Sequence, residues 1–207
     1  MTFSEENYLK AIYHLTVVST SGVSTNAIAE VMETKASSVT DMLKKLAEKD
    51  LINYKKYQGV TLTDKGKLAA KMIVRKHRLW EVFLVEKLDF SWDEVHDIAE
   101  QLEHIKSEKL INKLDEFLNF PTEDPHGDPI PNAEGMIVKV EKQLLSELTE
   151  KQAGVCVGVK DTSSEFHQYL DKLEIALGSK IEVVSKESFY LSLKIKVVKK
   201  ELMISNK

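Results

Sequence analysis

The chain has 207 residues and a mass of 23.5 kDa, with 29 Lys and Arg against 33 Asp and Glu, a length that fits one large domain or two to three small ones. A hydrophobic content of 43% excludes a disordered chain. No apolar run nears the roughly 18 residues that span a bilayer. The N-terminus lacks the basic and apolar regions of a signal peptide. A single cysteine, Cys156, excludes an intramolecular disulfide framework and a thiolate zinc cage, so we expect a soluble, cytoplasmic protein with no membrane partner.

The net charge of −4 argues at first against a nucleic-acid partner, but the charge is unevenly distributed. Residues 1–76 carry 12 Lys and Arg and 8 Asp and Glu, a net charge of +4. Residues 77–140 carry 6 and 15, a net charge of −9, and residues 141–207 carry 11 and 10, a net charge of +1. Charge asymmetry of this kind predicts different partners for different segments.

The basic segment has the pattern of three helices followed by a β-ribbon. Ser4 is a candidate N-cap for the first helix and Ser24 for the second, and apolar residues recur at helical spacing over a third helix at about 37–49. LINYKKY and VTLT, separated by Gln-Gly, predict a two-stranded ribbon, after which Thr63 begins a further helix. This order is that of a winged helix-turn-helix domain, which we place at residues 1–72.

In a winged helix-turn-helix domain the third helix fits the major groove of DNA, and its N-terminal residues meet base edges and phosphates. Short polar side chains at that helix N-terminus, and basic ones at the tip of the ribbon, are therefore the predicted DNA contacts. The candidates are Lys35, Ser37, Ser38, Thr40 and Asp41 on the helix and Lys55, Lys56 and Tyr57 on the ribbon. The alternative is a winged helix used for protein contacts, or another small three-helix domain.

The acidic segment carries three histidines and three carboxylates at three- or four-residue spacing on two predicted helices: His77, Glu81, His96, Glu100, Glu103 and His104. Such spacing places the side chains on one face of each helix, so two helices packed side by side can bring all six together. A nitrogen and oxygen donor set suits Mn(II) or Fe(II), with Zn, Co or Ni able to compete. The alternative is a solvated acidic face with incidental histidines. His14, His126 and His167 lack such company, and we expect them to be surface or packing residues.

All four prolines fall between Pro121 and Pro131, in the stretch PTEDPHGDPIPNAEG, which predicts a linker at 121–140. Beyond it, VCVGVK, KIEVVSK and FYLSLKIKVV have the pattern of strands, and FHQYLDKLEIAL that of a helix ended by Gly178. We therefore expect a separate β-rich module at 141–207. Cys156 falls in one of its predicted strands and is expected to pack as an apolar residue.

Several of these stretches together resemble the diphtheria toxin repressor and manganese transport regulator (DtxR/MntR) family. The likeness covers at least residues 4–135 and rests on SSVTDMLKKLAEKDLI, the YQGVTLTDKG wing, RKHRLWEVFL, VHDIAEQLEHIKSE and PHGDPIP, in that order. The tail is similar to the small SH3-like, FeoA-type domain of longer members. The resemblance implies a mainly α (α+β) chain: a winged helix-turn-helix, a helical metal-binding and dimerisation domain at 73–120, and a C-terminal SH3-like β module.

The resemblance also implies a function: a metal-dependent repressor of metal-ion homeostasis that binds a palindromic operator as a homodimer when loaded with Mn(II) or Fe(II). Glu100, Glu103 and His104 match the family's primary metal ligands, and His77, Glu81 and His96 match a second site of the toxin-repressor branch. Glu100 stands where that branch has cysteine, and so resembles the manganese branch.

Some positions depart from the family pattern. Asn7 stands where the family usually has Asp or Met as an N-terminal ligand, and it can still offer an amide oxygen. Lys10 stands where the manganese branch has Glu, and a lysine there would repel a closely spaced second cation. Asp161 and Glu165 lie near where some relatives supply extra ligands to the second site.

Two other functions stay open from the residues alone. One is a winged-helix regulator whose effector is not a metal. The other is a metallohydrolase that uses the histidine and glutamate cluster. Against the hydrolase, the spacing from His96 through Glu100 to His104 is not H-E-x-x-H, and no nucleophile accompanies it. We therefore expect that the protein is not an enzyme.

Overall fold

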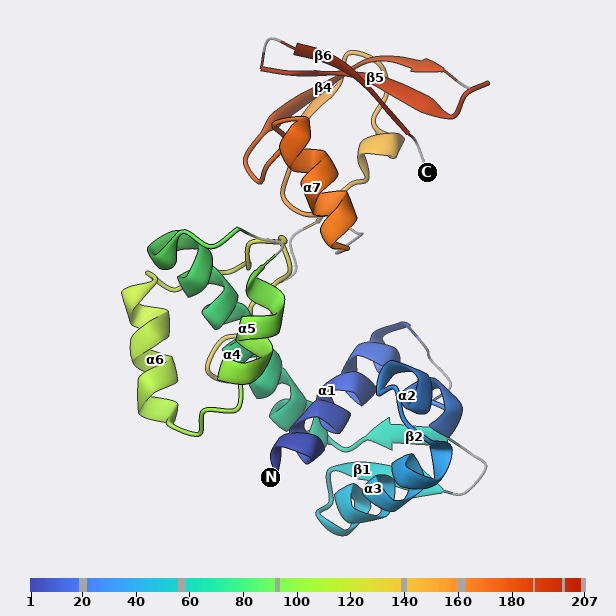
Figure 1. Cartoon of the computed structure of the whole chain (residues 1–207), viewed down its shortest axis with the longest axis vertical. Coiled ribbons are helices and arrows are strands. Elements are labelled where there is room, and N and C mark those ends of the chain that lie inside the picture. The colour runs from blue at the N-terminus through green and yellow to red at the C-terminus, as the bar shows by residue number, and fades with distance from the viewer. Residues whose placement is uncertain are drawn as a thin grey trace.

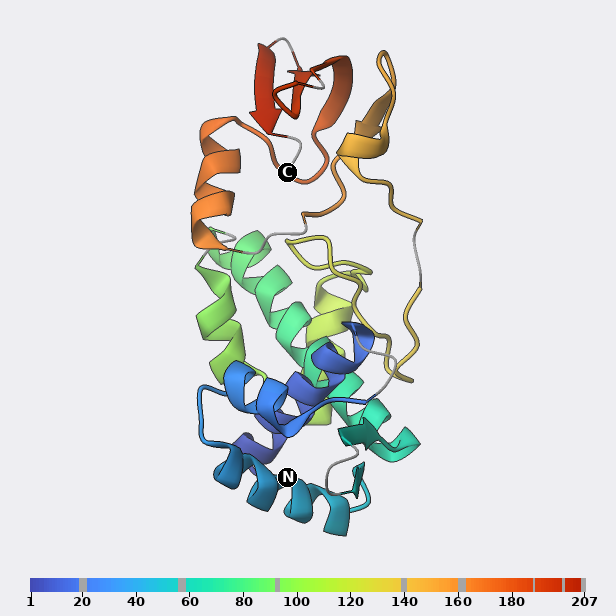
Figure 2. The ribbon, with the colours of Figure 1, turned by 90° about the vertical axis from the view of Figure 1, so that its right-hand side faces the viewer.

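The computed structural model describes residues 1–18, 22–55, 59–91, 94–138, 141–159, 163–187, 189–198 and 200–205. The molecule is elongated, and its parts follow one another along the long axis in chain order (Figures 1 and 2). The N-terminal helices and ribbon lie at one end, a group of helices in the middle and a small sheet at the other end. Among the described residues, no helix is both long and apolar enough to cross a membrane.

The N-terminal part has the predicted winged helix-turn-helix order. It consists of α1 (Phe3–Val18), α2 (Thr25–Val31), α3 (Ala36–Glu48) and the antiparallel strands β1 (Ile52–Lys55) and β2 (Gly59–Leu62). One core joins them, because α1, α3 and β2 each contribute side chains with no exposed surface, among them Ile12, Leu43 and Val60. This packing leaves the N-terminal turn of α3 exposed.

Helix caps explain where two of these helices begin. Ser24 caps α2 as predicted, since its side chain accepts a hydrogen bond from the Ala27 N–H. The expected cap at Ser4 is wrong, because α1 begins one residue earlier, at Phe3. Instead, the Thr2 hydroxyl accepts from the Glu5 N–H at 3.3 Å, and the Glu5 carboxylate accepts from the Thr2 N–H at 2.9 Å. This reciprocal pair is a capping box.

Helix α4 (Asp64–Leu88) connects the winged domain to the middle of the molecule. Thr63 caps it by accepting from the Gly66 N–H at 3.0 Å. Position 66 requires glycine because the backbone of Leu51 lies against it: a Cβ there would lie 1.7 Å from the Leu51 carbonyl oxygen. The first half of α4 packs in the N-terminal core, and its second half packs against α5 (Val95–Leu102) and α6 (Glu108–Phe117). A movement of the winged domain relative to the middle helices must therefore involve α4 or the side chains beside it.

The proline-rich stretch has no helix or strand among its described residues, apart from a bridge between Glu123 and Pro129. It nevertheless packs on the middle helices, and Ile130 belongs to their core. The Asp124 carboxylate holds its turn by accepting from the N–H groups of His126 (2.8 Å) and Asp128 (2.9 Å).

The C-terminal module is β-rich, as predicted. After the short helix η1 (Leu145–Glu147), it holds an antiparallel sheet in the order β3 (Ala153–Val155), β4 (Lys180–Glu187), β5 (Ser192–Val197) and β6 (Lys200–Ser205), with α7 (Ser164–Lys172) between β3 and β4. A bulge interrupts the β4–β5 pairing between Val183 and Ser185.

Two expectations about this module need correction. The strand expected over 155–160 ends at Val155, so Cys156 follows the strand; it is half-buried and packs against the module's core, as an apolar residue would. The helix expected to reach Gly178 ends at Lys172, because Glu174 adopts a left-handed conformation (φ 59°) that stops it.

Candidate metal centre and DNA-reading face

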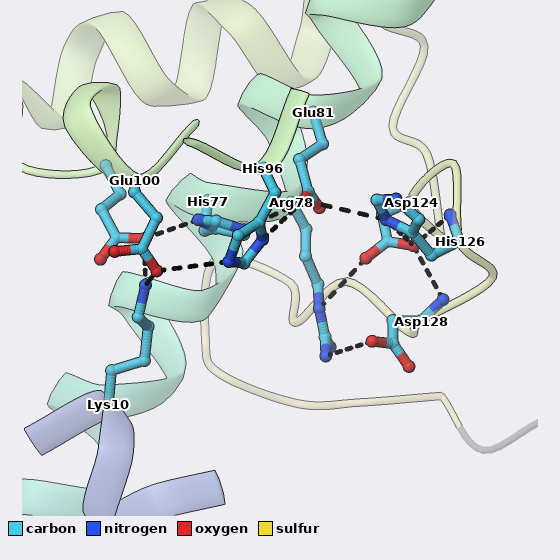
Figure 3. A network of polar contacts seen from close by, with 10 residues as sticks. Lys10, His77, Arg78, Glu81, His96, Glu100, Asp124, His126 and Asp128 are labelled. Carbon is cyan, nitrogen blue, oxygen red and sulfur yellow. Dashed lines mark hydrogen bonds and ion pairs between the residues drawn. The ribbon is translucent and has the colours of Figure 1, made fainter. Parts of the chain in front are cut away.

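His77 lies at the centre of the polar network on α4 (Figure 3). Its Nδ1 lies 2.7 Å from Glu103 Oε2 and its Nε2 lies 3.0 Å from Glu81 Oε1. Burial alone would lower the pKa of His77, but hydrogen bonds to Glu103 and Glu81 outweigh it and raise that pKa to about 9. The ring is therefore a cation at neutral pH and donates to both carboxylates.

Glu103, at the C-terminal end of α5, is completely buried. Its Oε2 accepts hydrogen bonds from His77 and, at 2.7 Å, from Lys10 of α1. Its Oε1 lies 4.0 Å from Nε2 of His104 and has no hydrogen-bond partner within the described part of the chain. An ionised oxygen left in this state is costly. Glu103 therefore has one oxygen satisfied by cations and one still available.

His104 is held by α1. Its Nδ1 donates to Glu6 Oε2 at 2.7 Å, and its ring stacks on Phe3 with 4.6 Å between centroids. A carboxylate on one ring nitrogen directs the other nitrogen toward a ligand, which is the usual arrangement of a metal-bound histidine. Next to Glu6 on α1, the Oδ1 of Asn7 is also buried without a partner among the described residues. α1 thus supplies one unsatisfied buried oxygen, from Asn7, and the residues that end α5 supply another, from Glu103, together with the oriented imidazole nitrogen of His104.

A second group of donors surrounds Glu81. His96 Nδ1 lies 3.6 Å and His126 Nδ1 3.8 Å from Glu81 Oε1. His126 also lies 3.9 Å from Asp124 Oδ1 and is only 8% exposed. His126 is buried, but the expectation that it lacks neighbouring carboxylates is wrong, because the turn held by Asp124 carries it against α4, beside Glu81. The pattern D-x-H within the proline-rich stretch was the available signal for both residues.

The two carboxyl groups of this second group, Glu81 and Asp124, have pKa values shifted in opposite directions. Burial would raise the pKa of Glu81, but its interactions with His126, His77 and His96 hold that pKa well below the ordinary value. Burial and the nearby Glu81 charge raise the pKa of Asp124 to about 6, although Arg78 opposes the shift. Glu81 is thus the permanent anion, and Asp124 gains or loses its proton close to neutral pH.

The structure brings the predicted ligands His77, Glu81, His96, Glu100 and Glu103 together in overlapping groups, whereas His104 is in none of the sets found among the described residues. Donor atoms lie within 4.8 Å of one another in three sets: His77, Glu81 and His96; His77, Glu100 and Glu103; and Glu81, Asp124 and His126. Glu165 is exposed on the first turn of α7 and is in none of the sets found among the described residues. Asp161 lies outside the described residues.

The predicted DNA-reading residues are mostly on the surface. Lys35, Ser37, Ser38 and Asp41 are exposed at the start of α3, and Lys55 is exposed at the end of β1. Thr40 is half-buried, and its hydroxyl donates to the Ala36 carbonyl at 2.9 Å. Lys56 and Tyr57 lie outside the described residues.

Family models match the chain in three consecutive parts. The N-terminal DNA binding domain of iron dependent repressors matches residues 1–60, and the metal binding and dimerisation domain of the same repressors matches residues 63–132. The FeoA domain matches residues 143–207.

Individual relatives agree with these matches. A solved manganese-dependent transcriptional repressor in complex with manganese is 35% identical, with a TM-score of 0.81 over 97% of this chain and 92% of that one. The transcriptional regulator MntR of Oceanobacillus iheyensis is 33% identical over 150 residues, 72% of this chain and 99% of the relative. The iron-dependent repressor IdeR of Mycobacterium tuberculosis is 34% identical over 158 residues, 74% and 68% of the two chains.

A probable metal transport system membrane protein of Chlamydia trachomatis is 44% identical over 86 residues, which are only 19% of its length. That match concerns a segment and not the whole protein. The longer matches, together with the centre between α1, α4 and α5, lead to one conclusion. The chain belongs to the DtxR/MntR family of metal-dependent, DNA-binding transcriptional repressors and carries its divalent metal-binding and dimerisation domain, not an enzyme's active site.

Proposed function

We propose that this protein represses genes of metal-ion homeostasis in the cytoplasm, as a homodimer on a palindromic operator, when it is loaded with Mn(II) or Fe(II). We also propose that residues 1–72 read the operator, that 73–120 bind metal and dimerise, and that 121–140 link them to the module at 141–207. The metals are favoured by the donors, which are nitrogen and oxygen without sulfur. Manganese and iron also occur in the names of the relatives.

One observation carries the proposal. The side-chain amide oxygen of Asn7 and the Oε1 of Glu103 are buried without a hydrogen-bond partner in the described structure. Asn7 follows Glu6, which orients His104, in the sequence, and Glu103 Oε1 lies 4.0 Å from the other ring nitrogen of His104. Buried acceptors in native proteins are nearly always satisfied, so orphaned ones call for an explanation. A divalent cation held by Asn7, Glu103 and His104 supplies it. Glu100 belongs to the same group through its place beside Glu103.

The second group has the composition of an additional cation site. It consists of two sets that share Glu81: His77, Glu81 and His96, and Glu81, Asp124 and His126. A nitrogen of His77 can bind a metal only after it loses its proton, so binding there is coupled to proton release. Asp161 and Glu165 remain proposed as weaker ligands from the C-terminal module.

The ligands explain how metal can control DNA binding. Asn7 belongs to α1 of the winged domain, whereas Glu103 is the C-cap of α5 and His104 follows it. When bound, the divalent ion supplies the positive charge that these donors share. Asn7 and Glu103 then restrict the position of the winged domain, so DNA binding costs less ordering. Coupling between two such sites is typically about 1–3 kcal/mol.

Operator geometry follows from the dimer. Two winged domains restricted in this way read half-sites about one helical turn, or a multiple of it, apart. The exposed start of α3 enters the major groove, and Lys35 and Lys55, with Lys56 and Tyr57, contact phosphates or the adjacent groove.

The test begins by selecting binding sites from a random pool of duplex DNA with Mn(II)-loaded protein under anaerobic conditions. Affinity for the selected site is then measured by fluorescence anisotropy with Mn(II), Fe(II), Zn(II) and chelator, at fixed ionic strength. We expect a palindromic site and affinity at least about fivefold weaker with chelator. Equal affinity in chelator and in Mn(II) or Fe(II) would contradict metal control and favour a non-metal effector.

A matched pair of variants locates the effect. His104→Gln keeps a donor toward Glu6 but loses the imidazole ligand, and we expect it to lose the metal response while it still dimerises. Lys113→Met removes an exposed ion pair on α6, away from the centre, and should keep the response. Sedimentation velocity reports the dimer in both variants.

A further inference from the structure

Lys10 inserts a fixed positive charge into the metal centre. It lies on α1, and its side chain is only 12% exposed. Its Nζ lies 2.6 Å from Glu100 Oε1 and 2.7 Å from Glu103 Oε2, so the ammonium donates to two carboxylates of the centre at once (Figure 3). Lys10 therefore lies between two predicted metal ligands of α5.

The two oxygens of Glu103 divide between different partners. Oε2 is taken by Lys10 and His77, while Oε1 is on the side of His104, 4.0 Å from its Nε2. The available oxygen can serve a divalent ion while the ammonium keeps the other. The centre thus has room for one fixed cation and one exchangeable cation on the same carboxylate.

We propose that Lys10 is a built-in counter-cation of the metal centre. Lys10 takes the place of a divalent ion that would bridge Glu100 and Glu103, and it ties α1 to α5 before metal binds. The proposal rests on the proposed function, because it concerns the same centre. Its physical basis is charge. A buried ionised Glu103 requires a positive partner, and an ammonium on its Oε2 repels a second divalent ion that would bridge Glu100 and Glu103.

A merely structural lysine predicts different behaviour. If Lys10 only stabilised the fold, its loss would weaken both the apo protein and metal binding. A counter-cation competes with the metal for the same negative charge, so its removal destabilises the apo protein but tightens metal binding. The two measurements then change in opposite directions, and this opposition is the signature to look for.

Lys10→Met tests the competition in the full-length protein. The variant removes the charge and keeps most of the apolar stem. We expect a lower melting temperature in chelator than for the wild type, together with roughly tenfold tighter Mn(II) binding. Weaker or unchanged Mn(II) affinity would overturn the proposal. Lys113→Met, which removes a lysine from an exposed pair with the same 2.6 Å separation, is the control and should leave Mn(II) affinity unchanged.

Lys10→Glu tests the ion count. This variant replaces the fixed cation by a further carboxylate, and we expect equilibrium dialysis to give one more Mn(II) per subunit than the wild type. Electron paramagnetic resonance should show an exchange-coupled pair of Mn(II) ions in the variant and none in the wild type. Equal ion counts, or a coupled pair already present in the wild type, would refute the proposal. If Lys10→Glu does not fold, the Mn(II) affinity of Lys10→Met still tests the proposal.

The wild type separates this proposal from the proposed function. If the DNA affinity of the wild type is the same with metal and with chelator, the proposed function fails. If wild-type DNA binding depends on metal but the Lys10 variants behave as a structural lysine predicts, only the counter-cation role fails.

Discussion

The charged state of His77 makes the stability of the metal-free protein depend on pH. Its pKa is raised to about 9 in the folded protein, against an ordinary value of 6.5. A group with a raised folded pKa contributes stability that is fully present below its unfolded pKa and is lost as pH rises through its folded pKa. At about 1.4 kcal/mol per pKa unit, the contribution of His77 is about 3 kcal/mol. The window in which it disappears is pH 6.5 to about 9.

The variant His77→Gln measures this contribution of His77 to stability. The free energies of unfolding of variant and wild type are compared in chelator by urea titration between pH 6 and pH 9.5, with tryptophan fluorescence, to which Trp80 on α4 contributes. We expect the deficit of the variant to be about 3 kcal/mol larger at pH 6 than above pH 9. Ile28→Val, which trims the core of the winged domain, is the control and should show a constant deficit of about 1 kcal/mol. A deficit for His77→Gln that is constant, or grows with pH, would refute the charged-histidine reasoning.

Three further substitutions test other parts of the molecule. Asn7→Asp adds a carboxylate to the α1 donors and should tighten Mn(II) binding about tenfold in calorimetry; unchanged affinity would argue against Asn7 as a ligand. Gly127→Ala places a Cβ 2.0 Å from the Val157 carbonyl oxygen at a positive φ, so it should separate the C-terminal module from this turn, and hydrogen exchange at the Val159 amide should accelerate. Lys35→Ala should lower the slope of log affinity against log salt by about one on every DNA sequence; an unchanged slope would remove Lys35 from the phosphate contacts.

The winged domain could be predicted from the sequence because its signals are local. Apolar spacing, the Ser24 and Thr63 caps and the ribbon turn each act over a few residues. The same holds for His77 with Glu81 and for His96 with Glu100, whose four-residue spacing alone places them on one face of a helix.

The remainder of the centre could not be predicted from spacing, because tertiary packing assembles it. His126 is 45 positions from Glu81 in the sequence, and only the Asp124 turn brings the two together. Lys10 is separated by 90 positions from Glu100, and only the resemblance to the family, not its local pattern, distinguished it from a solvated lysine. The ends of secondary structure in the C-terminal module were also missed, since a left-handed residue such as Glu174 gives no strong composition signal.

The carboxylates of the acidic segment, whose net charge is −9, lie in alternating order with positive groups, one of which comes from the basic segment. Positive and negative groups follow one another from Lys10 through Glu103 and His77 to Glu81. One end of this series is on α1 of the winged domain. The other end meets the turn of His126, whose carbonyl oxygen accepts from the Val159 N–H of the C-terminal module at 3.2 Å. A proton lost from His77, or a cation gained beside Glu103, alters the balance for the neighbours on both sides, so the winged domain and the C-terminal module are exposed to the same electrostatic change.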